Sequence, residues 1–260
     1  MTSISLSGSD GAPEREIDEV ASAHSSDTFY EYAADTVWGR YLNAPGEAAL
    51  RAAASSLVGG TSLDVGCDAG RWSQLLADLG FSPVCVDVRE EALEICRRRL
   101  PSARCHLAQP DDVSFPVADG SIDLLLAWEV PPVTNAAWFA PEAARVVRSG
   151  GLLICTIFNP VSIRGLAYRC AMLVSPSRRK DRVYGGPSFA RATADLDAQG
   201  FDLLSAEGLG WAPFSRLSNA PLIPFFVRLE RVLGLRRLVR FSPFVVLVAR
   251  RRPTEAQRPR

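Results

Sequence analysis

Two hydrophobic patterns take turns along the middle of the chain. Short, nearly continuous apolar runs are typical of strands buried on both faces. They predict strands at 61–66, 82–88, 103–108, 121–128 and 151–158. Between these runs, apolar residues recur three and four positions apart, which predicts helices at 71–80, 89–100 and 141–148. Strands that alternate with helices in this way predict a parallel sheet covered on both faces.

The pattern continues on both sides of this alternation. A helix is predicted at 46–57, and a helix at 188–200 precedes two further strands at 201–208 and 244–251. The first residues are rich in Ser, Asp, Glu and Gly, which is typical of a disordered tail. The expected organisation is a disordered tail at 1–26, one domain at 27–252 with its core at about 45–160, cap segments at 27–44, 159–187 and 211–241, and a C-terminal tail at 253–260.

The segment 211–241 separates the last two predicted strands and is too long for a hairpin loop. Its apolar residues share one helical stripe: Phe225, Phe226, Leu229, Val232 and Leu233. The charged residues Arg228, Glu230 and Arg231 lie outside that stripe. Three interpretations stay open. The segment is a lid over an apolar acceptor, a basic amphipathic helix at 222–241 that lies on anionic lipid, or a helix packed on the core.

Composition narrows the class of protein without naming a partner. Hydrophobic residues make up 47% of the chain and charged residues 22%, as in soluble globular enzymes. The formal net charge is zero, but residues 1–150 hold 22 acidic and 11 basic residues, and residues 151–260 hold 7 acidic and 18 basic ones. The two parts therefore carry −11 and +11, which fits an anionic substrate, a membrane surface or two solvated faces.

Cysteine and histidine usage argues against a disulfide framework and a metal site. The six cysteines form no C-x-x-C pair and most lie in apolar runs, as expected for free thiols in a reducing compartment. With only His24 and His106, a zinc site is not expected. The chain has no signal-peptide pattern and no apolar run of the roughly 18–20 residues that span a membrane, so we expect a cytoplasmic protein.

The stretch SLDVGCDAGRWS, residues 62–73, places a glycine turn between the first strand and the next helix. Gly66 and Gly70 allow the backbone to approach a ligand closely, and the start of the helix offers free N–H groups. The next strand ends in Asp87, whose carboxylate can accept hydrogen bonds from both hydroxyls of a ribose. Together these features predict a site for an adenosine-type ligand.

The dinucleotide fingerprint G-x-G-x-x-G is incomplete, because Asp68 and Arg71 stand where its second and third glycines would be. A pyrophosphate needs close approach to bare N–H groups. S-adenosylmethionine has no phosphate and can be held without the missing glycine. A nicotinamide-dependent oxidoreductase is therefore disfavoured.

Four stretches, taken in order, resemble the class I S-adenosylmethionine-dependent methyltransferases. LDVGCDAGRW resembles the first motif of that family, whose usual form is close to L-D-x-G-C-G-x-G. VCVDV resembles its second-strand acid, FPVADGSIDLLLAWEV the segment leading into its fourth strand, and RVVRSGGLLICTIFNP its R-V-L-K-P-G-G turn and fifth strand. The resemblance covers about residues 45–160. It implies a Rossmann-like, seven-stranded, mostly parallel α/β sheet with an antiparallel last strand, and methyl transfer from a sulfonium.

The resemblance also implies which residues hold the cofactor. By match, Asp64, Gly66, Cys67 and Gly70 would line the methionine end, Asp87 and Val88 the ribose, and Gln109 the adenine amine, with Trp128 facing the cofactor or substrate. Asp68 departs from the family's glycine, and two interpretations stay open. Either its backbone is left-handed and its side chain is turned aside, or its carboxylate faces the ammonium of the methionine.

The sequence offers one weak candidate for a general base. Glu129 follows the fourth strand, where the family often has a histidine. Its surroundings also bear on nucleic acids, because enzymes that methylate DNA or RNA amino groups carry Asn or Asp before Pro-Pro and an aromatic residue after it. Here Val130 and Val133 occupy those places, so no nucleic-acid partner is expected.

The expected function is S-adenosylmethionine-dependent methylation of a small, apolar acceptor, either lipid-like or a secondary metabolite. The basic segment 222–241 adds peripheral membrane contact to the expected partners. A non-catalytic S-adenosylmethionine-binding partner or regulatory subunit is the alternative, because a strong base is missing and Asp68 departs from the motif.

Overall fold

A computed structural model describes residues 28–57, 59–174 and 183–253. The tail expected at 1–26 and all but the first residue of the tail expected at 253–260 lie outside the described residues.

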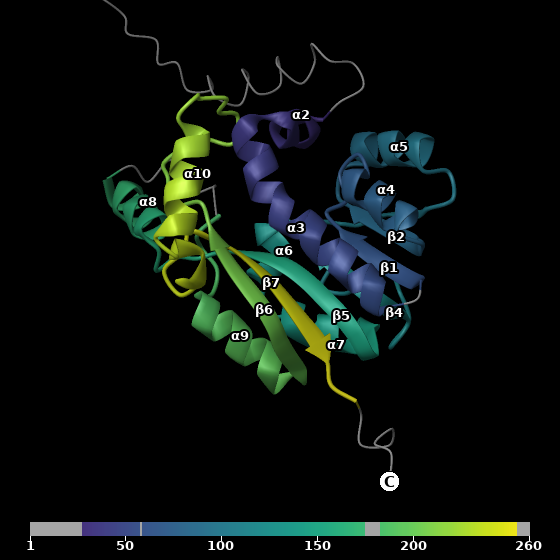
Figure 1. The fold of residues 1–260 in the computed structure, drawn as a ribbon. Helices are drawn as coiled ribbons and strands as arrows, with labels where there is room; N and C mark the ends of the chain where they lie inside the picture. Colours follow the sequence, from purple (N-terminus) through teal and green to yellow (C-terminus); the bar gives the residue numbers. More distant parts are fainter. Residues whose placement is uncertain (1–27, 58, 175–182, 254–260) are drawn as a thin grey trace, which may run out of the picture.

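A seven-stranded sheet forms the centre of the fold, with the strand order β3-β2-β1-β4-β5-β7-β6 (Figure 1). The strands are β1 (Gly60–Val65), β2 (Phe81–Asp87), β3 (Arg104–Leu107), β4 (Ile122–Ala127), β5 (Val147–Phe158), β6 (Phe201–Leu209) and β7 (Phe244–Arg251). Neighbouring strands pair in parallel except at β7, which is antiparallel to both β5 and β6. The predicted α/β fold, with its antiparallel last strand, is confirmed.

One edge of this sheet collects the ends of many strands. The parallel strands β1, β2, β4 and β5 end there. Strand β6 ends there too, because β5 and β6 are both antiparallel to β7 and therefore run in the same direction. Strand order reverses between β1 and β4, since β2 and β3 lie on one side of β1 and the later strands on the other. Ligands of such sheets bind outside the carboxyl ends of the strands at this switch point.

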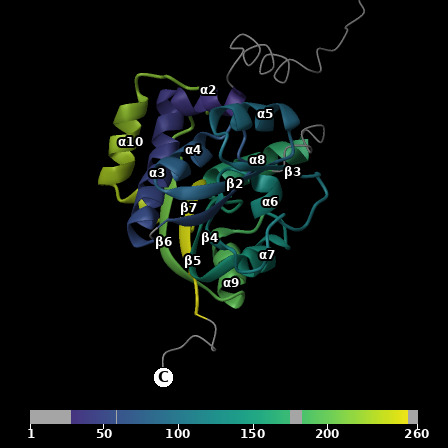
Figure 2. The same ribbon diagram turned by 90° about the vertical axis from the view of Figure 1, so that its right-hand side faces the viewer.

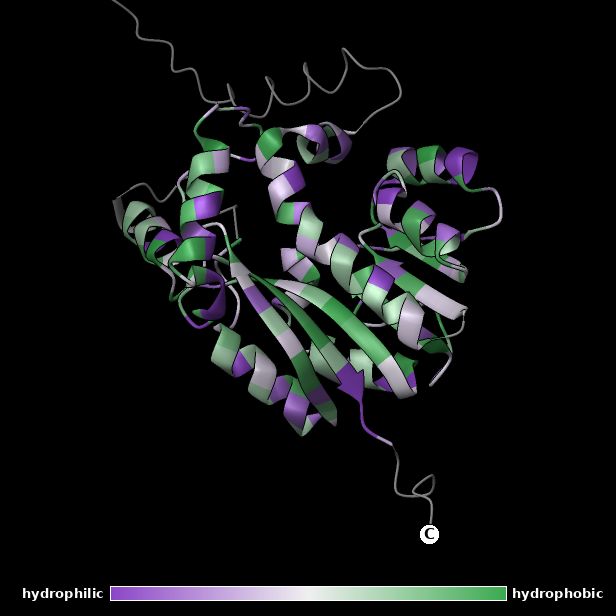
Figure 3. Ribbon diagram, viewed as in Figure 1, coloured by the Kyte–Doolittle hydropathy of each residue, from purple (hydrophilic) through white to green (hydrophobic). Residues whose placement is uncertain are grey.

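Helices cover both faces of the sheet (Figures 1 and 2). One face carries α3 (Val37–Ser56), α4 (Arg71–Asp78) and α10 (Ile223–Val232), which share a core with Leu124 and Leu126 of β4. The other carries α7 (Phe139–Val146) and α9 (Phe189–Ala198), which share a core with Leu125. Adjacent residues of β4 therefore enter different cores, which explains the apolar run at 124–127. The strands β5 and β7 are likewise largely hydrophobic (Figure 3). The remaining elements are α2 (Phe29–Asp35), α5 (Glu90–Arg99), α6 (Pro131–Thr134), α8 (Ile163–Val174) and the 3-10 helix η2 (Leu235–Arg237).

Helix α3 begins earlier than predicted, at Val37 rather than at residue 46. Thr36 caps it, because its Oγ1 accepts a hydrogen bond from the Gly39 N–H at 2.9 Å. Pro45 lies inside the helix without ending it. Trp38 and Tyr41, both buried before the proline, pack this first half against the core, and this packing outweighs the local cost of Pro45.

Strand β5 also begins earlier than predicted, at Val147 rather than at residue 151. The predicted helix at 141–148 therefore ends at Val146. Pairing between β4 and β5 shifts register between Ile122 and Leu124, which accommodates the extra residues at the start of β5.

Candidate active site

A cavity of about 530 Å³ lies at the carboxyl edge of the sheet, at the switch point between β1 and β4. Its walls come from the turns after β1, β2 and β4, from residues 108–115, from α2, and from Arg216 in the 211–241 segment. The volume lies within the range of small-molecule sites. The cavity therefore lies where the fold predicts a ligand.

The turn after β1 forms the floor of this cavity. Gly66 and Gly70 have φ angles of 69° and 83°, in the left-handed region that favours glycine. The N–H groups of Gly66 and Cys67 donate to the Val86 carbonyl oxygen at 2.7 and 3.1 Å, which ties the turn to β2. A β-carbon at Gly66 would lie 2.5 Å from Val130 Cγ2, so glycine is required for space as well as for conformation.

Asp68 lines the cavity with a left-handed backbone, at φ 50°. Its carboxylate accepts hydrogen bonds from the Thr28 hydroxyl and the Arg89 guanidinium. The side chain is therefore engaged at the rim of the site. The left-handed backbone is the one expected in the first of the two interpretations drawn from the sequence; the position of the carboxylate relative to the methionine ammonium stays a prediction.

Asp87 is buried at the end of β2, and its carboxylate is oriented by backbone donors. Oδ2 accepts from the Asp68 N–H at 2.8 Å, and Oδ1 accepts from the Arg89 N–H at 3.0 Å. Each carboxylate oxygen keeps a second lone pair for a ligand. Val88 and Gln109 line the same part of the cavity, so three of the predicted cofactor residues lie together.

Two of the predicted cofactor residues are not among the described residues that line the cavity. Asp64 lies behind the turn, fully buried, where its Oδ2 accepts from the Ser73 hydroxyl at 2.6 Å. Burial raises the pKa of Asp64 to about 8. Gly70 is the residue before α4, and a β-carbon there would meet Cys96 Sγ at 2.6 Å. Both residues support the turn from behind in this structure.

An apolar slot adjoins Asp87. Phe115 and Trp138 pack edge to face with ring centroids 5.6 Å apart, and Ala108 and Val133 line the same wall. Apolar surfaces beside a buried carboxylate suit a flat, uncharged ring such as a purine.

Trp128, at the end of β4, lines the cavity and is held from three sides. Its Nε1–H donates to Asn43 Oδ1 at 3.1 Å, its ring lies 4.9 Å from that of Trp72, and Gly46 of α3 leaves room for it. The contact with Gly46 explains why α3 has a glycine here, since a β-carbon would lie 2.4 Å from the indole.

Glu129 follows Trp128 and occupies a strained backbone position, at φ 55°. Its N–H donates to Thr156 Oγ1 at 2.7 Å, and its Oε2 forms an ion pair with Arg216. Oε1 is buried and has no hydrogen-bond partner among the described residues. Burial raises the pKa of Glu129, and the adjacent Arg216 opposes that shift. Glu129 thus brings an unsatisfied acceptor to a residue that lines the cavity.

Sequence reasoning placed Arg216 and Tyr30 only within the cap segments 211–241 and 27–44. Both line the cavity, and Tyr30 is close enough to Glu129 and Arg216 for their charges to act on the pKa of its phenol, which burial raises. Arg216 comes from a loop docked on α3, because its carbonyl oxygen accepts from Thr36 Oγ1 at 2.8 Å. Tertiary contacts of this kind bring Arg216 to Glu129.

Charge around the cavity is predominantly negative. The acidic side chains outnumber the basic ones by six to three: Glu31, Asp68, Asp87, Asp111, Asp112 and Glu129 against Arg71, Arg89 and Arg216. An acidic wall favours a cationic ligand over a pyrophosphate.

Residues 63–155 match a family model described as a methyltransferase domain. This matched part of the chain belongs to the class I S-adenosylmethionine-dependent methyltransferases. The cofactor of this family is S-adenosylmethionine. The slot beside Asp87 fits its adenosine, and the acidic wall fits its sulfonium and ammonium charges.

Curated relatives align with only part of the chain. The 2-methyl-6-phytyl-1,4-hydroquinone methyltransferase of Synechocystis sp. is 33% identical over 104 residues, which cover 39% of this chain and 33% of that protein. The demethylmenaquinone methyltransferase of Tropheryma whipplei is 29% identical over 120 residues, which cover 44% of this chain and 50% of that protein. The matching region thus spans between a third and a half of these relatives' length.

Among solved structures, a geranyl diphosphate methyltransferase in complex with GPP and sinefungin has a fold similar to that of this chain. The TM-score is 0.54 at 15% identity, over 81% of this chain and 80% of that chain. At this identity the likeness concerns the fold alone.

The methyltransferase fold also gathers cysteines that the sequence keeps apart. Cys67, Cys85 and Cys96 are buried with their sulfur atoms within 4.8 Å of one another, and Cys105 Sγ lies 3.8 Å from Cys96 Sγ. These thiols come from four elements or turns, so no local spacing could reveal the cluster. It packs beneath the turn that carries Gly66.

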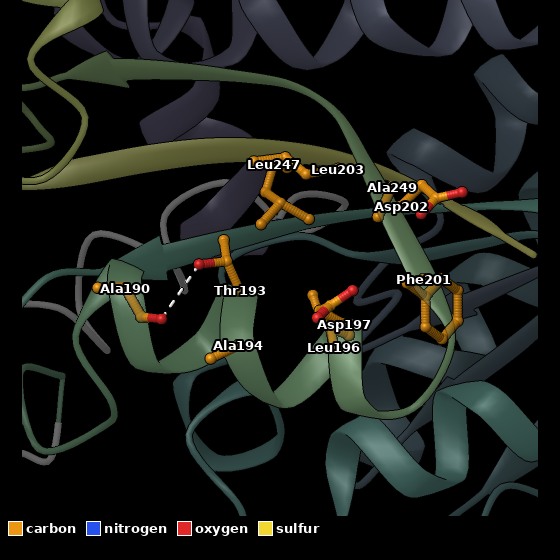
Figure 4. Close-up of a pocket in the computed structure, with 10 residues that line it drawn as sticks. All are labelled: Ala190, Thr193, Ala194, Leu196, Asp197, Phe201, Asp202, Leu203, Leu247 and Ala249. Atoms are coloured by element: carbon orange, nitrogen blue, oxygen red, sulfur yellow. Dashed lines mark hydrogen bonds between the residues drawn. The ribbon is translucent and has the colours of Figure 1, made fainter.

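A second cavity, of about 340 Å³, lies between α9, β6 and β7 (Figure 4). It is lined largely by apolar side chains near the start of β6, at the sheet edge opposite the methyltransferase site. The carboxylates beside it, Asp197 and Asp202, form ion pairs with Arg252. It therefore adds no group to the chemistry described above.

Proposed function

We propose that the chain transfers a methyl group from S-adenosylmethionine to a small, apolar acceptor, either lipid-like or a secondary metabolite. The single observation that carries this proposal is the acidic cavity at the switch point, with Asp87 at its adenosine end and the free Oε1 of Glu129 at its other end. Two relatives support the acceptor class, since their names specify a phytyl hydroquinone and demethylmenaquinone as substrates.

Bound S-adenosylmethionine supplies a methyl group on a sulfonium. The residues of this chain position that group and the acceptor in line, and positioning provides much of the rate. Asp87, Val88 and Gln109 hold the adenosine end. With a hydroxyl acceptor, the oxygen would bond to the methyl carbon as the methyl–sulfur bond breaks, and S-adenosylhomocysteine would leave as the neutral thioether. Glu129 Oε1 would accept the hydroxyl proton, while Arg216 would keep the Glu129 carboxylate oriented.

The alternative, a non-catalytic binder of S-adenosylmethionine, is favoured by the ion pair that links the proposed base to Arg216. An ion-paired carboxylate is a weaker base than a free one. In that case the cavity would bind the cofactor and leave it intact.

Formation of S-adenosylhomocysteine tests the proposal. The full chain is incubated with S-adenosylmethionine and a panel of prenylated quinols, other lipid phenols and polar phenols as controls. We expect product with apolar acceptors and none with polar ones. Calorimetric binding of S-adenosylmethionine without turnover on any acceptor would support the alternative, and absence of binding would contradict both.

Among the described residues, no helix is both long enough and apolar enough to cross a membrane.

A further inference from the structure

We infer that α10 and the residues up to 241 dock the protein on an anionic lipid bilayer. This inference rests on the proposed function, because a lipid-like acceptor would be drawn from such a bilayer. It starts from the orientation of α10, whose apolar stripe faces away from the core.

The stripe found in the sequence is exposed. Five large apolar side chains of α10 and its two flanking residues are between 38% and 75% exposed: Leu222, Phe225, Leu229, Val232 and Leu233. They recur at helical spacing, so they form one continuous surface. Helix α10 does pack on the core, as one of the three interpretations open from the sequence has it, but through Ile223 and the partly buried Phe226 and not through the exposed stripe.

The inward face of α10 is fixed by a polar contact. Glu230 is 4% exposed, and both of its carboxylate oxygens lie 2.6 Å from the Tyr41 hydroxyl, whose single proton is shared between them. The Arg236 Nε–H donates to Glu230 Oε1 at 3.2 Å. Rotating the helix to bury the stripe would break these bonds and remove Ile223 from the core, so the apolar face stays outward.

Positive charge surrounds the exposed stripe. Arg228, Arg231, Arg237 and Arg240 are exposed in the same segment. Residues 222–241 contain one acidic residue, Glu230, and it is buried and paired. The surface continues through Leu238 and Phe241, which are 46% and 57% exposed. Apolar side chains rimmed by arginine, with no exposed acid, complement anionic headgroups above acyl chains.

The connection between β6 and β7, which contains α10, also adjoins the active site. It connects the carboxyl end of β6 to the start of β7, at the sheet edge that holds the cavity. The residues of this connection that precede α10 include Arg216, the ion-pair partner of Glu129. They are tied to α3, because the Trp38 N–H donates to the Ser218 carbonyl oxygen at 3.1 Å. Docking through α10 would therefore hold the site at the bilayer surface, where a lipid acceptor resides.

Vesicle flotation tests this inference on the full chain. The probes are vesicles of phosphatidylcholine alone and of equimolar phosphatidylcholine and phosphatidylglycerol. We expect binding to the anionic vesicles only. F225S/V232S removes apolar contacts and should weaken binding by at least about tenfold, and R228Q/R231Q should weaken it by a similar factor. The matched control is L204S, because Leu204 is 50% exposed on β6, outside the segment.

Three results would overturn the inference: no binding of the unmodified chain to anionic vesicles, undiminished binding of F225S/V232S, or self-association through the stripe in sedimentation without vesicle binding. S-adenosylmethionine affinity, measured by calorimetry, should be unchanged in F225S/V232S, which also shows that the variant folds. If vesicles bind as expected but no acceptor is methylated, the docking surface stands and the proposed function fails.

Discussion

Asp68 and Glu129 are the two non-glycine residues with positive φ in the described part of the chain, and both line the same cavity. Such conformations cost free energy and persist where surrounding contacts enforce them. At Asp68 these contacts are Arg89 and Thr28, and at Glu129 they are Thr156 and Arg216. The site therefore contains two acidic residues with strained backbones. The carboxylate of Asp68 is paired at the rim, and that of Glu129 is buried with one unpartnered oxygen.

Replacing Asp68 by glycine should leave the site functional. Asp68→Gly relieves the left-handed strain and removes a partly exposed ion pair, terms that are each about 1 kcal/mol and opposite in sign. We expect the dissociation constant for S-adenosylmethionine to change by less than about tenfold, measured by calorimetry. Asp87→Ala is the comparison and should weaken binding by more than that. Complete loss of binding in Asp68→Gly would mean that its carboxylate contacts the cofactor.

Replacing Glu129 by glutamine should separate binding from turnover. A general base works in its ionised form, so kcat/KM should fall as pH drops through the pKa of Glu129, which burial raises above its ordinary value of 4.5. Glu129→Gln should lose this acidic limb of the pH profile and reduce kcat by about a hundredfold or more. Cofactor affinity should stay nearly unchanged. An unaltered pH profile in the variant would exclude Glu129 as the base.

At the scale of elements, the contact between α3 and α10 organises the cap. Tyr41 of α3 bonds to Glu230 of α10 and also accepts from the Gly210 N–H at 3.0 Å, just after β6. Burial and the adjacent Glu230 raise the pKa of Tyr41, so it remains a protonated donor. One hydroxyl thus joins three segments that are far apart in the sequence.

Removing that hydroxyl should destabilise the fold. Tyr41→Phe leaves the buried Glu230 with Arg236 as a partner and leaves the Gly210 N–H without its acceptor, which should cost about 1–3 kcal/mol of unfolding free energy. Thermal unfolding should then begin several degrees lower. Glu230→Gln keeps a partner for Tyr41 and should cost less. A Tyr41→Phe variant as stable as the unmodified chain would mean that this contact is absent in solution.

At the scale of the whole molecule, the opposite charges of the two sequence halves have different surroundings. Acidic residues of the first half surround the cavity, while exposed arginines of the second half lie on α10 and its continuation. The molecule therefore presents a cation-binding pocket and a cationic outer surface. Ligand choice and docking follow from separate parts of the charge distribution.

The increase in unfolding free energy on ligand binding should show that the cavity prefers a cationic ligand to a pyrophosphate. S-adenosylmethionine at about one hundred times its dissociation constant should add about 2.7 kcal/mol to the unfolding free energy and raise the melting temperature. NAD should have no such effect, because the acidic wall repels its pyrophosphate. Equal stabilisation by both ligands, measured by scanning fluorimetry, would contradict the electrostatic argument.

The sequence by itself determined the sheet, the turn at 66–70 and the acid at the end of β2, because these depend on local periodicity and on residues adjacent in the chain. Only the tertiary structure decided the outward direction of the α10 stripe, the pairing of Glu129 with Arg216 and the cysteine cluster. Helical spacing defines an apolar face but not which way that face points, and here the buried Glu230 fixes the direction. Partners far apart in the chain leave no periodic signal, since packing alone brings them together.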